Sequence, residues 1–139
     1  MKVTLAAACG FCYGVRRAVE LAEQAEKGTH TLGPIIHNPQ VVGRLAEQGV
    51  SPVDSLDEVE KGAVVLIRSH GVGPDIYEKA DKQELKVIDA TCPHVKKAQQ
   101  DAKNIIEKGE KLIIVGEKAH PEVISISQWG ANRAIILDR

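Results

Sequence analysis

Hydrophobic positions along the chain follow two alternating patterns. Short runs rich in Val, Ile and Leu are typical of buried strands, whereas apolar residues that recur every three to four positions are typical of amphipathic helices. The clearest helical pattern covers residues 93–108, where Val95, Ala98 and Ala102 share one face and Gly109 follows. The predicted strands are 3–8, 63–68, 86–89, 112–115 and 134–137, and the predicted helices are 14–27, 39–48, 74–81, 93–108 and 121–129.

The order of these elements predicts the fold class. Strands and helices alternate from one end of the chain to the other, which is typical of α/β proteins with parallel sheets and flanking helices. Turn and capping residues fit the boundaries: Gly28 follows the first helix, and Asn38-Pro39 is a good start for the second. In parallel sheets the loops after the carboxyl ends of the strands carry the functional site.

The two ends of the chain carry separate expectations. Residues 1–8 could be a secretory signal, but the apolar run is short and leads directly into Cys9-Gly10-Phe11-Cys12. We therefore interpret residues 3–8 as a first buried strand and expect a cytoplasmic protein with no membrane span, since no apolar run approaches ~20 residues. Asp138-Arg139 follows a predicted strand with no closing helix, so we expect a chain that stops within its fold.

The charge balance and the cysteine count limit the kinds of partner and chemistry that we expect. The 18 basic residues nearly balance the 19 acidic ones, which argues against nucleic acid as the main partner. Three cysteines cannot form a complete set of disulfides, and in a reducing compartment cysteines in loops more often bind metal or act in catalysis.

The reactive side chains gather in the loops that join strands to helices. Each type alone has an ordinary explanation: a solvated or capping histidine, or a small buried cysteine. Their shared placement is less ordinary, because the loops after parallel strands meet at one sheet edge. The residues concerned are Cys9, Cys12, His37, His70, Cys92, His120 and Glu122.

Residue type suggests a role for each. Cys12 and Cys92 stand at predicted helix starts, where a thiolate is stabilised, and thiolates suit an electron-rich iron–sulfur cluster. His37, His70 and His120 lie beside glycines or helix starts and make a reasonable diphosphate site. Glu122 is the one acid in the group and the natural proton source. The Cys9-x-x-Cys12 spacing alone is a weak metal signal, because no second such pair completes a zinc site.

Five motifs together resemble the LytB family of 4-hydroxy-3-methylbut-2-enyl diphosphate reductases. The motifs are Gly10-Phe11-Cys12-Tyr13-Gly14-Val15, Ile36-His37-Asn38, Ser69-His70-Gly71-Val72, Asp89-Ala90-Thr91-Cys92-Pro93 and His120-Pro121-Glu122-Val123. The resemblance implies three similar α/β lobes around a cavity, with a 4Fe-4S cluster held by three thiolates. Two electrons and protons would remove the substrate's hydroxyl as water, giving isopentenyl and dimethylallyl diphosphate.

The same resemblance implies the residue roles. Cys12 and Cys92 match two cluster ligands, His37, His70 and His120 match the substrate-binding histidines, and His120 and Glu122 match the catalytic pair. The partners would be an allylic diphosphate and an electron donor such as ferredoxin or flavodoxin.

The chain departs from the family pattern in extent. It corresponds to about the first half, which we divide into a first lobe, 1–92, and an incomplete second lobe, 93–139. No residue matches the third cluster cysteine. We interpret Cys9 as a buried residue at a strand end; the alternative is a substitute third ligand. We expect weak or absent activity alone and pairing into a homodimer. The alternative function is a non-catalytic α/β fragment that binds metal or diphosphate.

Overall fold

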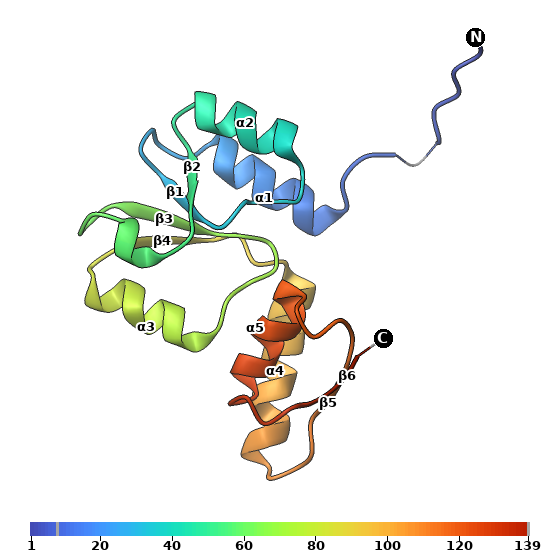
Figure 1. Cartoon of the computed structure of the whole chain (residues 1–139), viewed down its shortest axis with the longest axis vertical. Coiled ribbons are helices and arrows are strands. Elements are labelled where there is room, and N and C mark those ends of the chain that lie inside the picture. Colours follow the sequence, from blue (N-terminus) through green and yellow to red (C-terminus); the bar gives the residue numbers. More distant parts are fainter. Residues whose placement is uncertain (8, 139) are drawn as a thin grey trace.

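Two parallel sheets organise the chain, which we describe from a computed structural model covering residues 1–7 and 9–138 (Figure 1). The larger sheet has the strand order β2-β1-β3-β4 and the smaller one pairs β5 with β6. All pairings are parallel, which confirms the predicted α/β class. The strands are β1 (His30–Leu32), β2 (Ser51–Val53), β3 (Val64–Ile67), β4 (Lys86–Asp89), β5 (Ile113–Val115) and β6 (Ile135–Leu137).

Helices cover both faces of the larger sheet. In Figure 1, α1 and α2 lie on one side of it, α3 and the short 3-10 helix η1 on the other, and α4 and α5 pack side by side next to the smaller sheet. The helices are α1 (Tyr13–Glu23), α2 (Pro39–Glu47), η1 (Leu56–Glu58), α3 (Pro74–Lys82), α4 (Pro93–Glu107) and α5 (Pro121–Trp129). Four of the five predicted helices match to within one residue at each end, and the first ends earlier than residue 27.

Strand β3 supplies residues to two cores. Leu66 packs with Ala18 and Leu45 on the α1–α2 side, and Val65 packs with Leu56 and Ala80 on the η1–α3 side. This alternation follows from the strand geometry, in which successive side chains point to opposite faces. The central strand is therefore buried on both sides, which fixes the position of the loop that follows it.

The starts of the helices place the site residues. Proline stands in the first turn of α2, α3, α4 and α5, where its missing N–H costs no helical hydrogen bond. The residues at the N-caps of α1, α4 and α5 are Cys12, Cys92 and His120. Three reactive side chains thus sit at helix N-termini.

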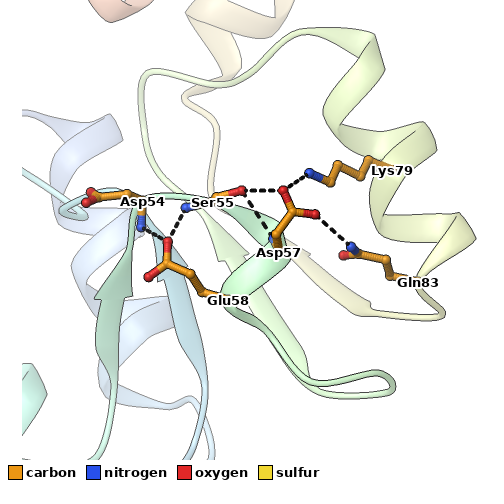
Figure 2. Close-up of polar contacts among 6 residues, drawn as sticks. All are labelled: Asp54, Ser55, Asp57, Glu58, Lys79 and Gln83. Carbon is orange, nitrogen blue, oxygen red and sulfur yellow. Dashed lines mark hydrogen bonds and ion pairs between the residues drawn. The ribbon is translucent and has the colours of Figure 1, made fainter.

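The connection between β2 and η1 is held by a capping box (Figure 2). The hydroxyl of Ser55 accepts from the N–H of Asp57, and the carboxylate of Glu58 accepts from the N–H of Ser55 at 2.7 Å. Asp57 also forms an ion pair with Lys79 of α3 at 2.6 Å. This pair is exposed to solvent, so it contributes little to the stability of the fold. These contacts join η1 to α3 under the larger sheet.

The predicted first strand is wrong. Residues 1–7 form no strand, with Val3 74% and Leu5 82% exposed, and residue 8 of the prediction lies outside the described residues. A strand forms only where a neighbour takes its backbone hydrogen bonds, and within the part of the chain that the structure describes neither sheet pairs with this segment. An apolar run indicates a tendency to form a strand, but it does not show that a neighbouring strand is present to pair with it.

The smaller sheet leaves one face open. Ile113 and Val115 of β5 and Ile135 and Leu137 of β6 are each more than half exposed.

The longest described helix, α4, has 15 residues and is amphipathic, and no helix within residues 1–7 and 9–138 has the length and hydrophobicity needed to cross a bilayer.

Candidate functional site

Three histidine rings lie side by side. The ring centroids of His37 and His70 are 5.1 Å apart, and those of His70 and His120 are 5.8 Å apart in an edge-on arrangement. His37 precedes α2, His70 follows β3, and His120 caps α5. The expectation that these loops meet holds for the histidines, but with a correction: His120 follows β5 of the smaller sheet, so two sheets supply the site rather than one edge.

The first cysteine loop borders the same place. A pocket of about 240 Å³ is lined by Phe11 together with His37 and His70. Phe11 immediately precedes Cys12, whose side chain is exposed. The loop that carries Cys12 therefore lies against the histidines.

The second cysteine packs onto the start of α1. A Cβ atom added at Gly14 would lie 2.6 Å from Sγ of Cys92, so only glycine leaves room for that sulfur. Gly14 is two residues after Cys12, which brings the two cysteine loops together. Both cysteines occupy helix N-caps and accept no capping hydrogen bond, and a helix N-terminus stabilises a thiolate.

The expectation that Cys9 is a buried residue at a strand end is wrong. Its side chain is exposed, because residues 1–7 join neither sheet. Within residues 1–7 and 9–138, no group of three or more His, Cys, Asp or Glu side chains is arranged to hold a metal ion. The structure thus brings together two cysteine loops without grouping Cys9 with them as a ligand set.

The tautomer of His120 follows from its hydrogen bond. Its Nδ1 accepts from the backbone N–H of Glu122 at 3.2 Å. A nitrogen that accepts a hydrogen bond carries no proton itself, so in this arrangement the N–H donor of the ring is on Nε2. Glu122 itself is half-buried in the first turn of α5.

His70 is held in its neutral form. Burial lowers its pKa to about 4, and electrostatic repulsion from neighbouring groups, first of all the Arg68 guanidinium, acts in the same direction. Its Nδ1 is buried and has no hydrogen-bond partner among the described residues. Sequence reasoning missed Arg68, a half-buried cation whose Nε is also unpaired there, although it directly precedes the Ser69-His70 motif.

We expect stability to fall in acid because of His70. The folded-state pKa of about 4 lies below the ordinary value of 6.5, so the unfolded chain binds the proton more tightly. The contribution of a neutral His70 is complete above pH 6.5 and is lost as the pH falls toward about 4. Denaturant unfolding of the parent and of His70→Asn at pH 7.5 and 5 measures this: the parent should lose more stability. An equal loss in both proteins would show that His70 is not held neutral.

Comparisons with known proteins show the family to which this chain belongs. The family model described as LytB protein matches residues 3–139. The chain belongs to the LytB family. It is 49% identical over 140 residues to the 4-hydroxy-3-methylbut-2-enyl diphosphate reductase of Citrifermentans bemidjiense, covering 99% of this chain and 50% of that protein. The reductase of that name from Clostridioides difficile is 40% identical over 141 residues, with the same coverage.

Solved structures agree with the family. A Plasmodium falciparum structure described as E-1-hydroxy-2-methyl-but-2-enyl-4-diphosphate reductase superimposes with a TM-score of 0.88 at 32% identity, covering 92% of this chain and 42% of that one. A structure described as (E)-4-hydroxy-3-methyl-but-2-enyl diphosphate reductase, the terminal enzyme of the non-mevalonate pathway, gives 0.83 at 43% identity, covering 94% and 48%. The chain spans about half the length of the relatives it matches.

Proposed function

We propose that this chain supplies part of the active site of a 4-hydroxy-3-methylbut-2-enyl diphosphate reductase. The reaction removes the allylic hydroxyl as water, with two electrons and two protons, and yields isopentenyl and dimethylallyl diphosphate. The observation that carries the proposal is the meeting of two cysteine loops with three histidines at one place. Family membership supports the chemistry, and the division into lobes at residue 92 stays part of the proposal.

The two thiols suit an iron–sulfur cluster. Cys12 and Cys92 would hold it, because their loops are in contact through Gly14 and both sulfurs stand at helix N-termini. A 4Fe-4S cluster, when bound, would pass on to the substrate the electrons that an external electron donor supplies. No third thiol joins these two among the described residues, so we expect cluster binding by this chain alone to be weak.

The histidines suit the diphosphate. A neutral imidazole N–H donates a hydrogen bond to a phosphate oxygen, and His120 has such a donor on Nε2. The buried Nδ1 of His70 has no partner among the described residues, and buried polar groups rarely stay unpaired. We infer that His37, His70 and His120 complete their hydrogen bonds with the ligand.

Glu122 is the proposed proton source. It follows His120 by two residues at the start of α5, and the cap that orients His120 is the N–H of Glu122 itself. The carboxyl group and the imidazole are therefore held on one turn of chain. A positioned acid of this kind typically contributes ~10²–10⁴-fold to a rate.

The proposal has a specific competitor. The chain spans half of its relatives, and its described residues include no complete metal-ligand group. The second candidate function is therefore that of an α/β fragment without turnover, which would bind diphosphate at the three neighbouring histidines, or metal.

Anaerobic assay of the reconstituted chain with the allylic diphosphate and a chemical reductant separates the two functions. Formation of isopentenyl and dimethylallyl diphosphate, even slowly, supports the reductase. Saturable binding of the diphosphate without product supports the binding fragment. If the chain neither binds the diphosphate nor forms product, both functions are refuted.

A further inference from the structure

The carboxylate of Asp89 stands at the end of β4, three residues before Cys92, and is surrounded by donors. Its Oδ1 accepts from the backbone N–H of Thr91 at 2.9 Å, and its Oδ2 accepts from the hydroxyl of Tyr77 at 3.0 Å. Lys96 of α4 lies 2.8 Å from Oδ2. One carboxylate therefore joins the Cys92 loop to α3 and to the first turn of α4.

Arg17 reaches the same loop from the other side. Its guanidinium donates to the backbone carbonyl of Asp89 at 3.3 Å and to that of Thr91 at 3.4 Å. Arg17 lies in α1, five residues after Cys12. The helix that begins at Cys12 is thus joined by one side chain to the loop that ends at Cys92.

The ionisation of the network suits this arrangement. Burial raises the pKa of Asp89, but the hydrogen bonds from Lys96 and Thr91 outweigh burial and lower it below its ordinary value. Burial and the charge of Asp89 raise the pKa of Tyr77 to about 12, so its hydroxyl keeps its proton and donates. The contacts to Asp89 are therefore hydrogen bonds to a charged acceptor, the stronger kind.

The thiol itself has no such support. Cys92 forms no side-chain hydrogen bond as the N-cap of α4, and its sulfur lies in the space above Gly14. Whatever fixes the short loop between β4 and α4 also fixes the sulfur. The backbone N–H of Cys92 donates to the carbonyl of Ser69 at 2.9 Å, and that of Ala90 donates to the carbonyl of Ile67 at 3.0 Å. Asp89 and Arg17 add side-chain contacts to the same loop.

We propose that Asp89 and Arg17 are positioning residues that hold the Cys92 loop against the start of α1, so that the thiols of Cys12 and Cys92 share one small space. The purpose of this arrangement rests on the proposed function, since a shared ligand needs both sulfurs together. The geometry can be tested without iron or substrate, so its failure and that of the reductase proposal are distinguishable.

The test measures how readily Cys12 and Cys92 are bridged. In a Cys9→Ser background these are the two cysteines of the chain, and a short bifunctional reagent such as dibromobimane becomes fluorescent only after reaction with both. The bridging rate is divided by the rate of alkylation with a monofunctional reagent. We expect this ratio to fall about fivefold or more in Arg17→Gln and in Asp89→Asn, because each loses hydrogen bonds that involve a charged group.

Matched variants separate positioning from general stability. Arg16→Gln removes the neighbouring exposed arginine of α1, and Lys97→Gln removes a lysine that pairs with Asp101 instead of Asp89. Neither should change the ratio. Arg17→Lys should recover part of it, and backbone amide exchange at Thr91 should accelerate in Asp89→Asn while global unfolding stays cooperative.

Several results would overturn the proposal. One is an unchanged ratio in folded Arg17→Gln and Asp89→Asn, another is an equal fall in Arg16→Gln, and a third is a parent that does not bridge at all. If Asp89→Asn does not fold, Lys96→Gln takes its place, because it removes a half-exposed partner of Asp89. An unchanged ratio in that variant and in Arg17→Gln would equally refute the role.

Discussion

Replacing Gly71 with alanine should destabilise the protein by about 2–5 kcal/mol, the largest change that we expect from a single methyl group. Gly71 has a φ of 71°, which costs an L-residue about 1–2 kcal/mol. The added Cβ would also lie 2.5 Å from Nε2 of Gln99 and 2.8 Å from Cγ2 of Thr91. Gln99 cannot simply swing away, because it is 4% exposed and its amide donates to the hydroxyl of Ser125.

Gly62→Ala is the matched control for this effect. Gly62 has a φ of 81° but nothing within 4 Å of an added Cβ, so only the backbone cost applies. Denaturant unfolding of both variants should show that Gly71→Ala costs more by about 1–3 kcal/mol, the usual range for overpacking. Equal costs would mean that the loop of His70 does not pack against α4 and α5 as described.

A methyl group at Gly14 should displace the Cys92 thiol. The added Cβ would lie 2.6 Å from the sulfur and 2.9 Å from Cβ of Cys92, well inside contact distance. Gly14 has no positive φ, so the helix itself would gain about 1 kcal/mol from alanine. We expect overpacking of about 1–3 kcal/mol to oppose that gain, and the bridging of Cys12 to Cys92 to slow sharply.

Gly43→Ala provides the comparison, because Gly43 is an exposed position in α2 with nothing within 4 Å of an added Cβ. That variant should gain the full helix contribution. Adding Cys92→Ala to Gly14→Ala removes the closest atom and should restore part of the lost stability, which a double-mutant cycle measures. No coupling between the two changes would contradict the contact between α1 and the Cys92 loop.

The hydrophobic periodicity of the sequence predicted the helices and strands whose own residues carry a clear pattern or cap. Helix α4 carries an apolar stripe and stops before Gly109, and Asn38 caps α2 by accepting from the N–H groups of Gln40 and Val41. Strands β1 and β2 were not predicted, because neither His30–Leu32 nor Ser51–Val53 is a run of apolar residues, and Pro52 of β2 cannot donate a hydrogen bond. The sheet accepts Pro52 because β2 is the edge strand next to β1.

The candidate site was partly predictable for a related reason. His70 and Cys92 follow neighbouring parallel strands, so their loops must lie at the same sheet edge. The approach of His120 from a second sheet depends on how the α4–α5 pair packs, including the hydrogen bond from Trp129 to the carbonyl of Val72 at 2.9 Å. Contacts between residues 57 positions apart leave no local pattern, so the sequence alone did not show them.

The most direct test of the central claim is the iron and sulfide content per chain after anaerobic reconstitution and gel filtration. We predict iron and acid-labile sulfide in equal amounts, held weakly and lost in air, because Cys12 and Cys92 are the two cysteines that we expect to bind the cluster. Both should fall close to zero in Cys12→Ser and in Cys92→Ser and stay unchanged in Cys9→Ser. Loading that survives the loss of Cys12 or Cys92, or a parent that takes up no sulfide-bound iron, would contradict it.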